Sequence, residues 1–141
     1  MEIDETKSSK SEARNPKQIQ MTEGENSKQY DLEARTFVMA QRVRRFVKQL
    51  PRTVANVEDV KQLIRASGSV GANYIEANES LSKKDFVVRI KICRKEAKEC
   101  RYWLHLLETG ERQQVHEERE LLVQEATELM KIFGSVMRKS M

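Results

Sequence analysis

The sequence contains few of the residues that interrupt helices, with two prolines and five glycines among 141 residues. Charged residues make up 34% of the chain, and no alternating strand pattern competes with the helical periodicity. A shortage of chain breakers beside many charged helix formers favours an all-α protein. The length suits one domain with a single core.

Cysteines and long apolar runs are also scarce. Cys93 and Cys100 are seven residues apart in a helical pattern, which separates their Cα atoms by roughly 10 Å and excludes a disulfide within that helix. Unpaired cysteines on an apolar stripe suit a reducing compartment. No segment reaches the roughly 18 consecutive apolar residues of a membrane span, and the polar N-terminal segment has no signal-peptide core. We therefore expect a soluble, cytoplasmic protein with no membrane contact.

Residue patterns for catalysis are missing too. A di-metal bundle needs Glu-x-x-His pairs, in which a glutamate stands three residues before each histidine. The residues three before His105 and His116 are Tyr102 and Gln113, so such pairs are absent from the sequence. Cys100 and His105 are five positions apart on a helix and face different sides, which does not suit a nucleophile and its base. We expect no enzyme, no metal and no cofactor.

Apolar residues recur at three- and four-residue spacing in four segments. This periodicity predicts helices at about 31–50, 57–80, 83–109 and 114–139, so that residues 30–141 form an antiparallel up-down four-helix bundle. The predicted buried stripes are Leu32, Thr36, Met39, Val43, Phe46 and Leu50 in the first helix, Phe86, Ile90, Cys93, Ala97, Cys100, Leu104 and Leu107 in the third, and Val115, Leu122, Ala126, Leu129, Phe133 and Val136 in the fourth.

Local signals set the predicted helix ends. Pro51 ends the first helix, Asn56 is expected to cap the second, and Gly110 is expected to stop the third. A capping box runs from Ser82 to Asp85, and Leu81 and Phe86 occupy the two positions of a hydrophobic staple around it.

Residues 1–29 are polar, with Ile3, Ile19 and Met21 as their sizeable apolar side chains. Such a composition cannot offset the entropy of ordering and predicts a flexible tail. The alternative is a short helix that docks on a partner through Ile19 and Met21.

The second helix carries small residues where a helix usually carries bulk. Gly68 and Gly71 each cost roughly 1 kcal/mol relative to alanine, so a close neighbour is expected at the helix surface. Close packing is the preferred explanation, and a kinked or locally unwound helix is the alternative. Gly68 to Gly71 also match the GxxG loop with which some domains clamp RNA, but those domains have strands around the loop and the flanking sequence here is helical.

Basic residues form two clusters that are candidates for phosphate contact. The first has no acidic residue and consists of Arg42, Arg44, Arg45, Lys48 and Arg52. The second lies in the third helix, where Asp85, Glu96 and Glu99 are interleaved, and Lys91, Arg94 and Lys98 are its predicted site residues; its members are Lys83, Lys84, Arg89, Lys91, Arg94, Lys95, Lys98 and Arg101. The acid-free cluster is the stronger candidate for binding nucleic acid, and a solvated, salt-bridged helix face is the alternative for both. Trp103 lies off the core stripe, either packed at the end of the bundle or in an oligomer contact.

Several motifs together resemble a known family. They are Gln62 to Asn78 (QLIRASGSVGANYIEAN), Ser82 to Phe86 (SKKDF), Lys95 to Glu99 (KEAKE) and Tyr102 to Leu107 (YWLHLL). In order and spacing they are similar to the four-helix-bundle proteins of the 23S ribosomal RNA intervening-sequence protein family, and the resemblance runs from about Val43 to Phe133. The N-terminal extension and Ala77-Asn78 depart from the family pattern.

The resemblance implies a bacterial four-helix bundle with no enzymatic activity and ring-like homo-oligomers, several of them pentamers. It also implies that Asn73 and Glu76 match a family motif and bond across helices or subunits. A related group assists reverse transcriptases of diversity-generating elements and contacts nucleic acid. We therefore expect a homo-oligomeric accessory factor that binds RNA or DNA. The alternative is a protein adaptor that uses its tail to recruit a partner such as a polymerase.

Overall fold

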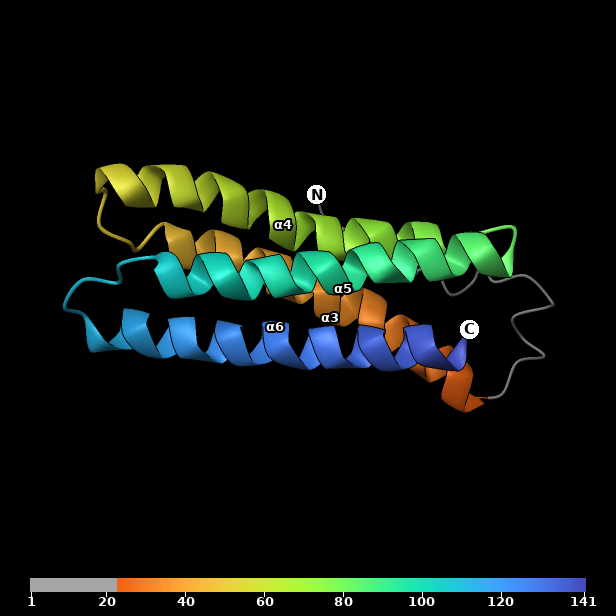
Figure 1. The fold of residues 1–141 in the computed structure, drawn as a ribbon. Coiled ribbons are helices and arrows are strands. Elements are labelled where there is room, and N and C mark those ends of the chain that lie inside the picture. Colours follow the sequence, from red (N-terminus) through yellow and green to blue (C-terminus); the bar gives the residue numbers. More distant parts are fainter. Residues whose placement is uncertain (1–22) are drawn as a thin grey trace. The chain divides into compact units, whose positions relative to one another are not determined.

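The computed structural model describes the backbone from Glu23 to Met141 and the side chains from Leu32 onward. The described part contains four helices and no strand: α3 (Glu23–Val47), α4 (Val54–Asn78), α5 (Lys83–Leu106) and α6 (Gln113–Lys139) (Figure 1). The all-α prediction is confirmed.

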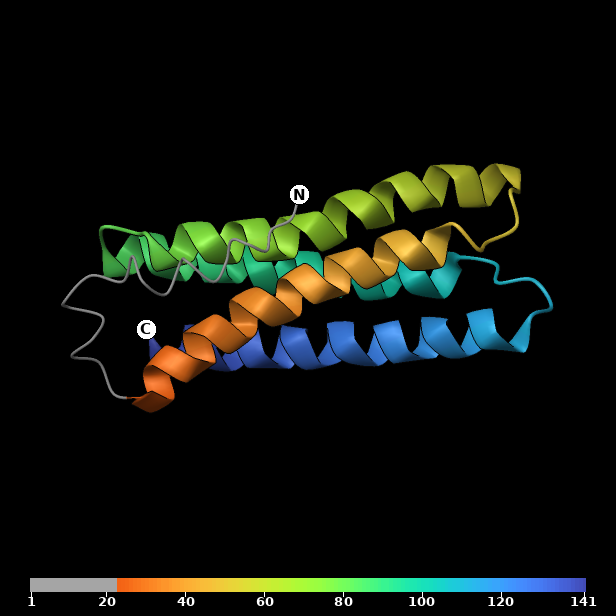
Figure 2. The ribbon, with the colours of Figure 1, turned by 180° about the vertical axis from the view of Figure 1, so that it is seen from behind.

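Residues 33–141 form one compact unit in which consecutive helices run in opposite directions (Figures 1 and 2). Helix α5 packs against both α4 and α6. Helix α3 closes the bundle, since Glu33 accepts a hydrogen bond of 2.9 Å from Asn78 of α4 and Arg35 pairs at 2.8 Å with Glu125 of α6. The prediction of an antiparallel up-down four-helix bundle is confirmed.

The predicted apolar stripes lie in the core. Ile90, Cys93, Ala97, Cys100 and Leu104 of α5 are all buried, as are the main stripe residues of α6, namely Val115, Leu122, Ala126, Leu129 and Phe133. The buried side of α4 carries Leu63, Ala66, Ser67, Val70, Tyr74 and Ala77. Tyr74, which the sequence analysis did not place in the core, lies with its ring 5.6 Å from that of Phe133.

Helix α3 begins at Glu23, earlier than the predicted start near residue 31. Residues 23–29, which were assigned to the flexible tail, are therefore helical, because a packed helix extends at low cost through residues that favour helix. The rest of the predicted tail, residues 1–22, lies outside the described residues.

The predicted cap of α4 is wrong. The helix begins at Val54, and Thr53 is the N-cap, whose hydroxyl accepts a hydrogen bond of 3.1 Å from the Asn56 amide. The Asn56 side chain is 2% exposed and bridges two loops: it donates to the carbonyls of Pro51 and Glu108, both at 2.9 Å, and accepts from the Glu108 amide at 3.0 Å. Asn56 thus joins the α3–α4 and α5–α6 connections at one end of the bundle.

Helix α5 starts as predicted, since the Ser82 hydroxyl accepts from the Asp85 amide at 3.0 Å. The hydrophobic staple is wrong, because Leu81 is 99% exposed and packs on nothing in the described structure. The helix ends at Leu106, before the predicted stop, and Gly110 lies in the following turn with φ of 77°. None of the described helices is long and apolar enough to cross a membrane.

Candidate nucleic-acid interface

The acid-free basic cluster of α3 does not form one surface. Successive helical residues are turned by about 100° from each other, so neighbours in sequence point in different directions. Arg42 pairs at 3.2 Å with Glu118 of α6, and Arg44 donates to the Ala40 carbonyl at 3.1 Å and lies beside Gly68 of α4. The other cluster members, Arg45, Lys48 and Arg52, are exposed. Two of the five predicted contacts are therefore engaged within the protein.

A more regular array follows one side of α5. One series of positions in α5 repeats at alternating spacings of three and four residues, namely 84, 87, 91, 94, 98, 101 and 105. From 87 onward, each position directly follows a residue of the predicted core stripe. This face carries the basic stripe, which we define as Lys84, Lys91, Arg94, Lys98 and Arg101. Arg94 lies next to Gly134, which places the stripe on the side of α5 that borders α6.

Two acidic residues of α5, Glu96 and Glu99, are turned the other way, toward α4. Glu96 has a buried side chain, and its carboxylate accepts from the Arg65 guanidinium at 3.3 Å. Glu99 accepts from the same guanidinium at 3.1 Å. The hydrogen bond to Glu96 and the charge of that carboxylate raise the pKa of Arg65 above its usual value. Glu96 and Glu99 are thus paired with cations away from the basic stripe, and within residues 32–141 no carboxylate pairs with a residue of that stripe.

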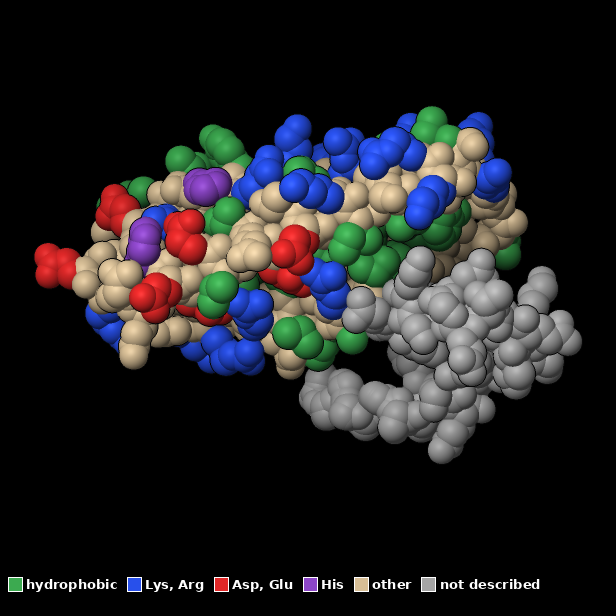
Figure 3. Space-filling model, turned by 90° about the horizontal axis from the view of Figure 1, so that it is seen from below, with side chains coloured by type: hydrophobic (Ala, Val, Ile, Leu, Met, Phe, Trp, Pro, Cys, Tyr) green, Lys and Arg blue, Asp and Glu red, His purple; other side chains and the backbone are tan. Residues whose placement is uncertain are grey.

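Helix α6 extends the positive surface. Its acidic residues all lie before Leu129, at Glu117, Glu118, Glu120, Glu125 and Glu128, whereas the last part of the helix carries Lys131, Arg138 and Lys139 and no acid. In Figure 3 the Lys and Arg side chains form a band over the upper part of the face toward the right, and the Asp and Glu side chains gather in the left half. On this face the upper band of Lys and Arg side chains thus extends beyond the acidic half of the bundle, and further Lys and Arg side chains lie among the acids at the lower left.

All five stripe residues belong to the second basic cluster of the sequence analysis, which missed the contribution of α6 to this surface. The acid-free last third of that helix is the signal that could have identified Lys131, Arg138 and Lys139.

Gly68 and Gly71 lie in the floor of a groove between α3 and α4, with a volume of about 420 Å³. A Cβ atom at Gly71 would stand 2.9 Å from the Thr36 hydroxyl, whereas one at Gly68 would only reach Arg44 at 3.6 Å. The walls include Phe37 and Ile75, which are about half exposed.

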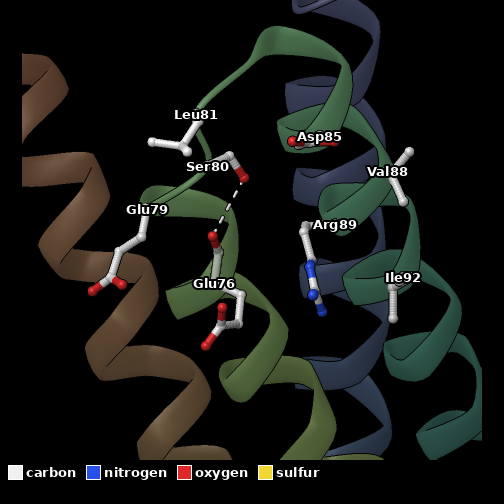
Figure 4. Close-up of a pocket in the computed structure, with 8 residues that line it drawn as sticks. All are labelled: Glu76, Glu79, Ser80, Leu81, Asp85, Val88, Arg89 and Ile92. Carbon is white, nitrogen blue, oxygen red and sulfur yellow. Dashed lines mark hydrogen bonds between the residues drawn. The ribbon is translucent and has the colours of Figure 1, made fainter.

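Asn73 and Glu76 lie near a hollow at the turn between α4 and α5. The side-chain oxygen Oδ1 of Asn73 accepts a hydrogen bond of 2.9 Å from the Arg89 guanidinium of α5, so this side chain bonds across helices. Glu76 is exposed and lines the hollow, of about 530 Å³, with Glu79, Ser80, Leu81, Asp85, Val88, Arg89 and Ile92 (Figure 4). Trp103 is half-buried and makes an edge contact with Tyr102, with ring centroids 5.1 Å apart.

Both cysteines are free and buried. Burial raises the pKa of the Cys93 thiol to about 12, and burial together with the nearby charge of Glu96 raises the pKa of Cys100 to about 12 as well. The thiolate, which is the nucleophilic form, is therefore disfavoured at both positions. Among the described residues no three His, Cys, Asp or Glu side chains are grouped as metal ligands.

Comparison with a family model and with solved structures finds similar proteins. The model of the family described as 23S rRNA-intervening sequence protein matches residues 28–135. A crystal structure at 1.70 Å of a protein of unknown function from the S23 ribosomal protein family of Bacteroides thetaiotaomicron is 31% identical, with a TM-score of 0.65 over 74% of this chain and 96% of that chain. No curated protein matches significantly.

Proposed function

This chain belongs to the 23S rRNA-intervening sequence protein family, and on that premise we propose that it is a non-enzymatic accessory factor that binds nucleic acid through the basic stripe. The observation that carries the proposal is the alignment of five cationic side chains along one helix face, none of them paired with a carboxylate within residues 32–141. From Lys84 to Arg101 the stripe spans roughly 25 Å at 1.5 Å per residue. This length covers about seven successive phosphates of one strand in a duplex.

The interaction is electrostatic, so it depends on salt. Five phosphate contacts to duplex DNA predict a slope of about −4.5 for the logarithm of affinity against the logarithm of salt concentration. Affinity should then fall by roughly two to three orders of magnitude between 50 and 200 mM salt. Fluorescence anisotropy with a labelled 20-base-pair DNA duplex measures this slope, and the same measurement with a 20-base-pair RNA duplex compares the two polymers.

A matched pair of charge reversals tests the location. The Lys91→Glu/Lys98→Glu variant removes two stripe contacts, and the Arg45→Glu/Lys48→Glu variant makes the same change in net charge on exposed residues in the last turn of α3 and just after it. We expect the stripe variant to lose at least tenfold in affinity and to have a shallower salt slope, and the α3 variant to lose much less. Equal losses in the two variants, or no binding by the natural chain at 50 mM salt, would refute the proposal.

The groove between α3 and α4 supports self-association as part of this function. Gly68, Gly71 and Ala72 leave its floor open, and Phe37 and Ile75 offer half-exposed apolar walls to a second copy. A homo-oligomer, with a pentameric ring as the arrangement that the resemblance implies, is expected to lose mass in light scattering when Ile75 is changed to glutamate. An unchanged mass for the Ile75→Glu variant would place the contact elsewhere.

The adaptor alternative predicts a different result. A chain that lacks residues 1–22 keeps all of α3 and should lose a protein partner such as a polymerase, while its own oligomeric mass and its nucleic-acid affinity stay unchanged.

A further inference from the structure

Two arginines from different helices meet over Gly134, near the C-terminal end of α6. A Cβ atom at Gly134 would stand 3.3 Å from Nη1 of Arg138 and 3.5 Å from Nε of Arg94. Both nitrogens are therefore close to one point above the α6 backbone, and they are at most about 7 Å apart. The absence of a side chain at Gly134 lets both cationic groups approach the helix at this point.

Neither guanidinium has a counter-charge in the described structure. The ion pairs of residues 32–141 engage Arg35, Arg42, Arg65 and Arg119 with carboxylates, but not Arg94 or Arg138. The neighbours on the same two faces are also basic, because Lys91 and Lys98 are three positions before and four positions after Arg94, and Lys131 is seven positions before Arg138. Two like charges are thus held together among further positive charge.

The chemistry of such a pair fits a phosphate. A guanidinium presents parallel N–H donors that match the oxygens of a phosphate, and charge-assisted bonds of this kind are about 2.8 Å long. One tetrahedral phosphate that accepts from a donor on each side bridges a gap of about 7 Å or less. In a nucleic-acid backbone the phosphate carries one negative charge on two non-bridging oxygens, so each of the two arginines can bind one of these oxygens.

We propose that Arg94 and Arg138 form a two-arginine phosphate clamp over Gly134, and that the clamp fixes one backbone phosphate of a nucleic acid lying along the basic stripe. The identity of the natural ligand rests on the proposed function, whereas the affinity for a phosphate group rests on the geometry of the two arginines. The stripe lysines contribute charge along the strand, and the clamp sets the register of the strand on the protein.

Inorganic phosphate tests the clamp without nucleic acid. The Nε–H signals of Arg94 and Arg138 in ¹⁵N-resolved NMR spectra should shift together with one dissociation constant, and the signal of Arg45 on α3 should stay in place. In the Arg138→Gln variant the affinity reported by Arg94 should fall by about tenfold, because one of two charge-assisted donors is lost. An Arg94 signal that titrates equally in this variant, or shifts no larger than those of Arg45, would overturn the clamp.

Nucleic acid tests the coupling between the two arginines. Arg94→Gln, Arg138→Gln and the double variant should each lose affinity for a 20-nucleotide strand by a similar factor of about ten, since either change breaks the same site. Lys84→Gln and Lys98→Gln are the control pair, and their losses should multiply, because they lie far apart on the stripe. Losses that multiply for the arginine pair as well would refute the clamp.

The two proposals fail in different ways. If the arginine variants bind nucleic acid as tightly as the natural chain does, the clamp is wrong and the proposed function stands. If the natural chain binds no nucleic acid while the two arginine signals still shift together with phosphate, the proposed function is wrong and the clamp is a site for a phosphate monoester or free phosphate.

Discussion

A methyl group added at Gly71 should lower the stability of the bundle, because it would meet the shortest contact found at any described glycine. Its ideal Cβ atom would stand 2.9 Å from Oγ1 and 3.2 Å from Cβ of Thr36 on α3. Thr36 is 1% exposed, and its hydroxyl donates to the Glu33 carbonyl at 3.1 Å. A buried β-branched side chain has few rotamers to escape into, so the two helices must move apart or Thr36 must lose its bond.

Gly68, three residues earlier on the same helix, gives the matched comparison. Its Cβ atom would meet only Nη2 of Arg44 at 3.6 Å, which is an ordinary contact with a flexible side chain. Replacement by alanine in the middle of a helix should therefore stabilise the protein by about 1 kcal/mol at Gly68. At Gly71 the same gain is opposed by an overpacking cost of about 1–3 kcal/mol. The free energies of unfolding of Gly68→Ala and Gly71→Ala should thus differ by about 1–3 kcal/mol, with Gly71→Ala the less stable.

Urea unfolding followed by circular dichroism measures this difference, and measurement at several protein concentrations removes the effect of self-association. The double variant Thr36→Ala/Gly71→Ala should recover part of the loss, because the atom in closest contact is gone. If Gly71→Ala is as stable as Gly68→Ala, or if the Thr36 change recovers nothing, then the short contact does not explain the glycine.

Two further predictions concern buried polar and titrating groups. Asn56→Ala should cost about 2–3 kcal/mol in urea unfolding, since it leaves two carbonyls and the Glu108 amide without their partner, whereas Asn73→Ala at a half-buried site should cost less; equal costs would contradict a bridging role. The thiols of Cys93 and Cys100 keep their protons in the folded state up to pH values near 12, whereas the unfolded chain releases these protons above the ordinary pKa of 9.0. The stability that the buried, protonated thiols contribute is therefore complete below pH 9 and is lost as the pH rises toward 12. The free energy of unfolding should fall by about half of 1.4 kcal/mol per thiol per pH unit at pH 9 and by about 1.4 kcal/mol per thiol per pH unit between pH 10 and 11, and the Cys93→Ala/Cys100→Ala variant should lack this part of the slope; an identical slope would exclude the thiols as its cause.

The helices could be predicted from sequence because one buried stripe repeats along each of them. The ends of the helices were less predictable, since they depend on contacts between distant segments. Asn56 looked like a cap because Asn is a common capping residue, but its side chain bonds to Glu108, which is 52 positions away. Leu81 stands at a staple position and is almost fully exposed, because the chain turns without bringing Phe86 against it.

The candidate interface shows the same dependence on three-dimensional arrangement. Along the sequence the α3 cluster looks stronger, because it contains no acid, and the α5 cluster looks neutralised by Glu96 and Glu99. A helix sorts residues by angle and not by sequence proximity. Arg42 therefore turns toward Glu118 on the next helix, while the acids of α5 turn toward Arg65 and leave the opposite side of α5 positive.

The way in which the charges are paired connects stability with function. Arg35 and Arg42 link α3 to α6, and Arg65 links α4 to α5, so each of these cations holds two helices together. The cations on the α5–α6 surface link nothing within the described chain, and because they share one sign they repel each other in the free protein. A bound polyanion would remove that repulsion and would therefore stabilise the bundle by binding only its folded form. The surface that contributes least to the stability of the isolated protein is thus the one for which an anionic ligand would contribute most.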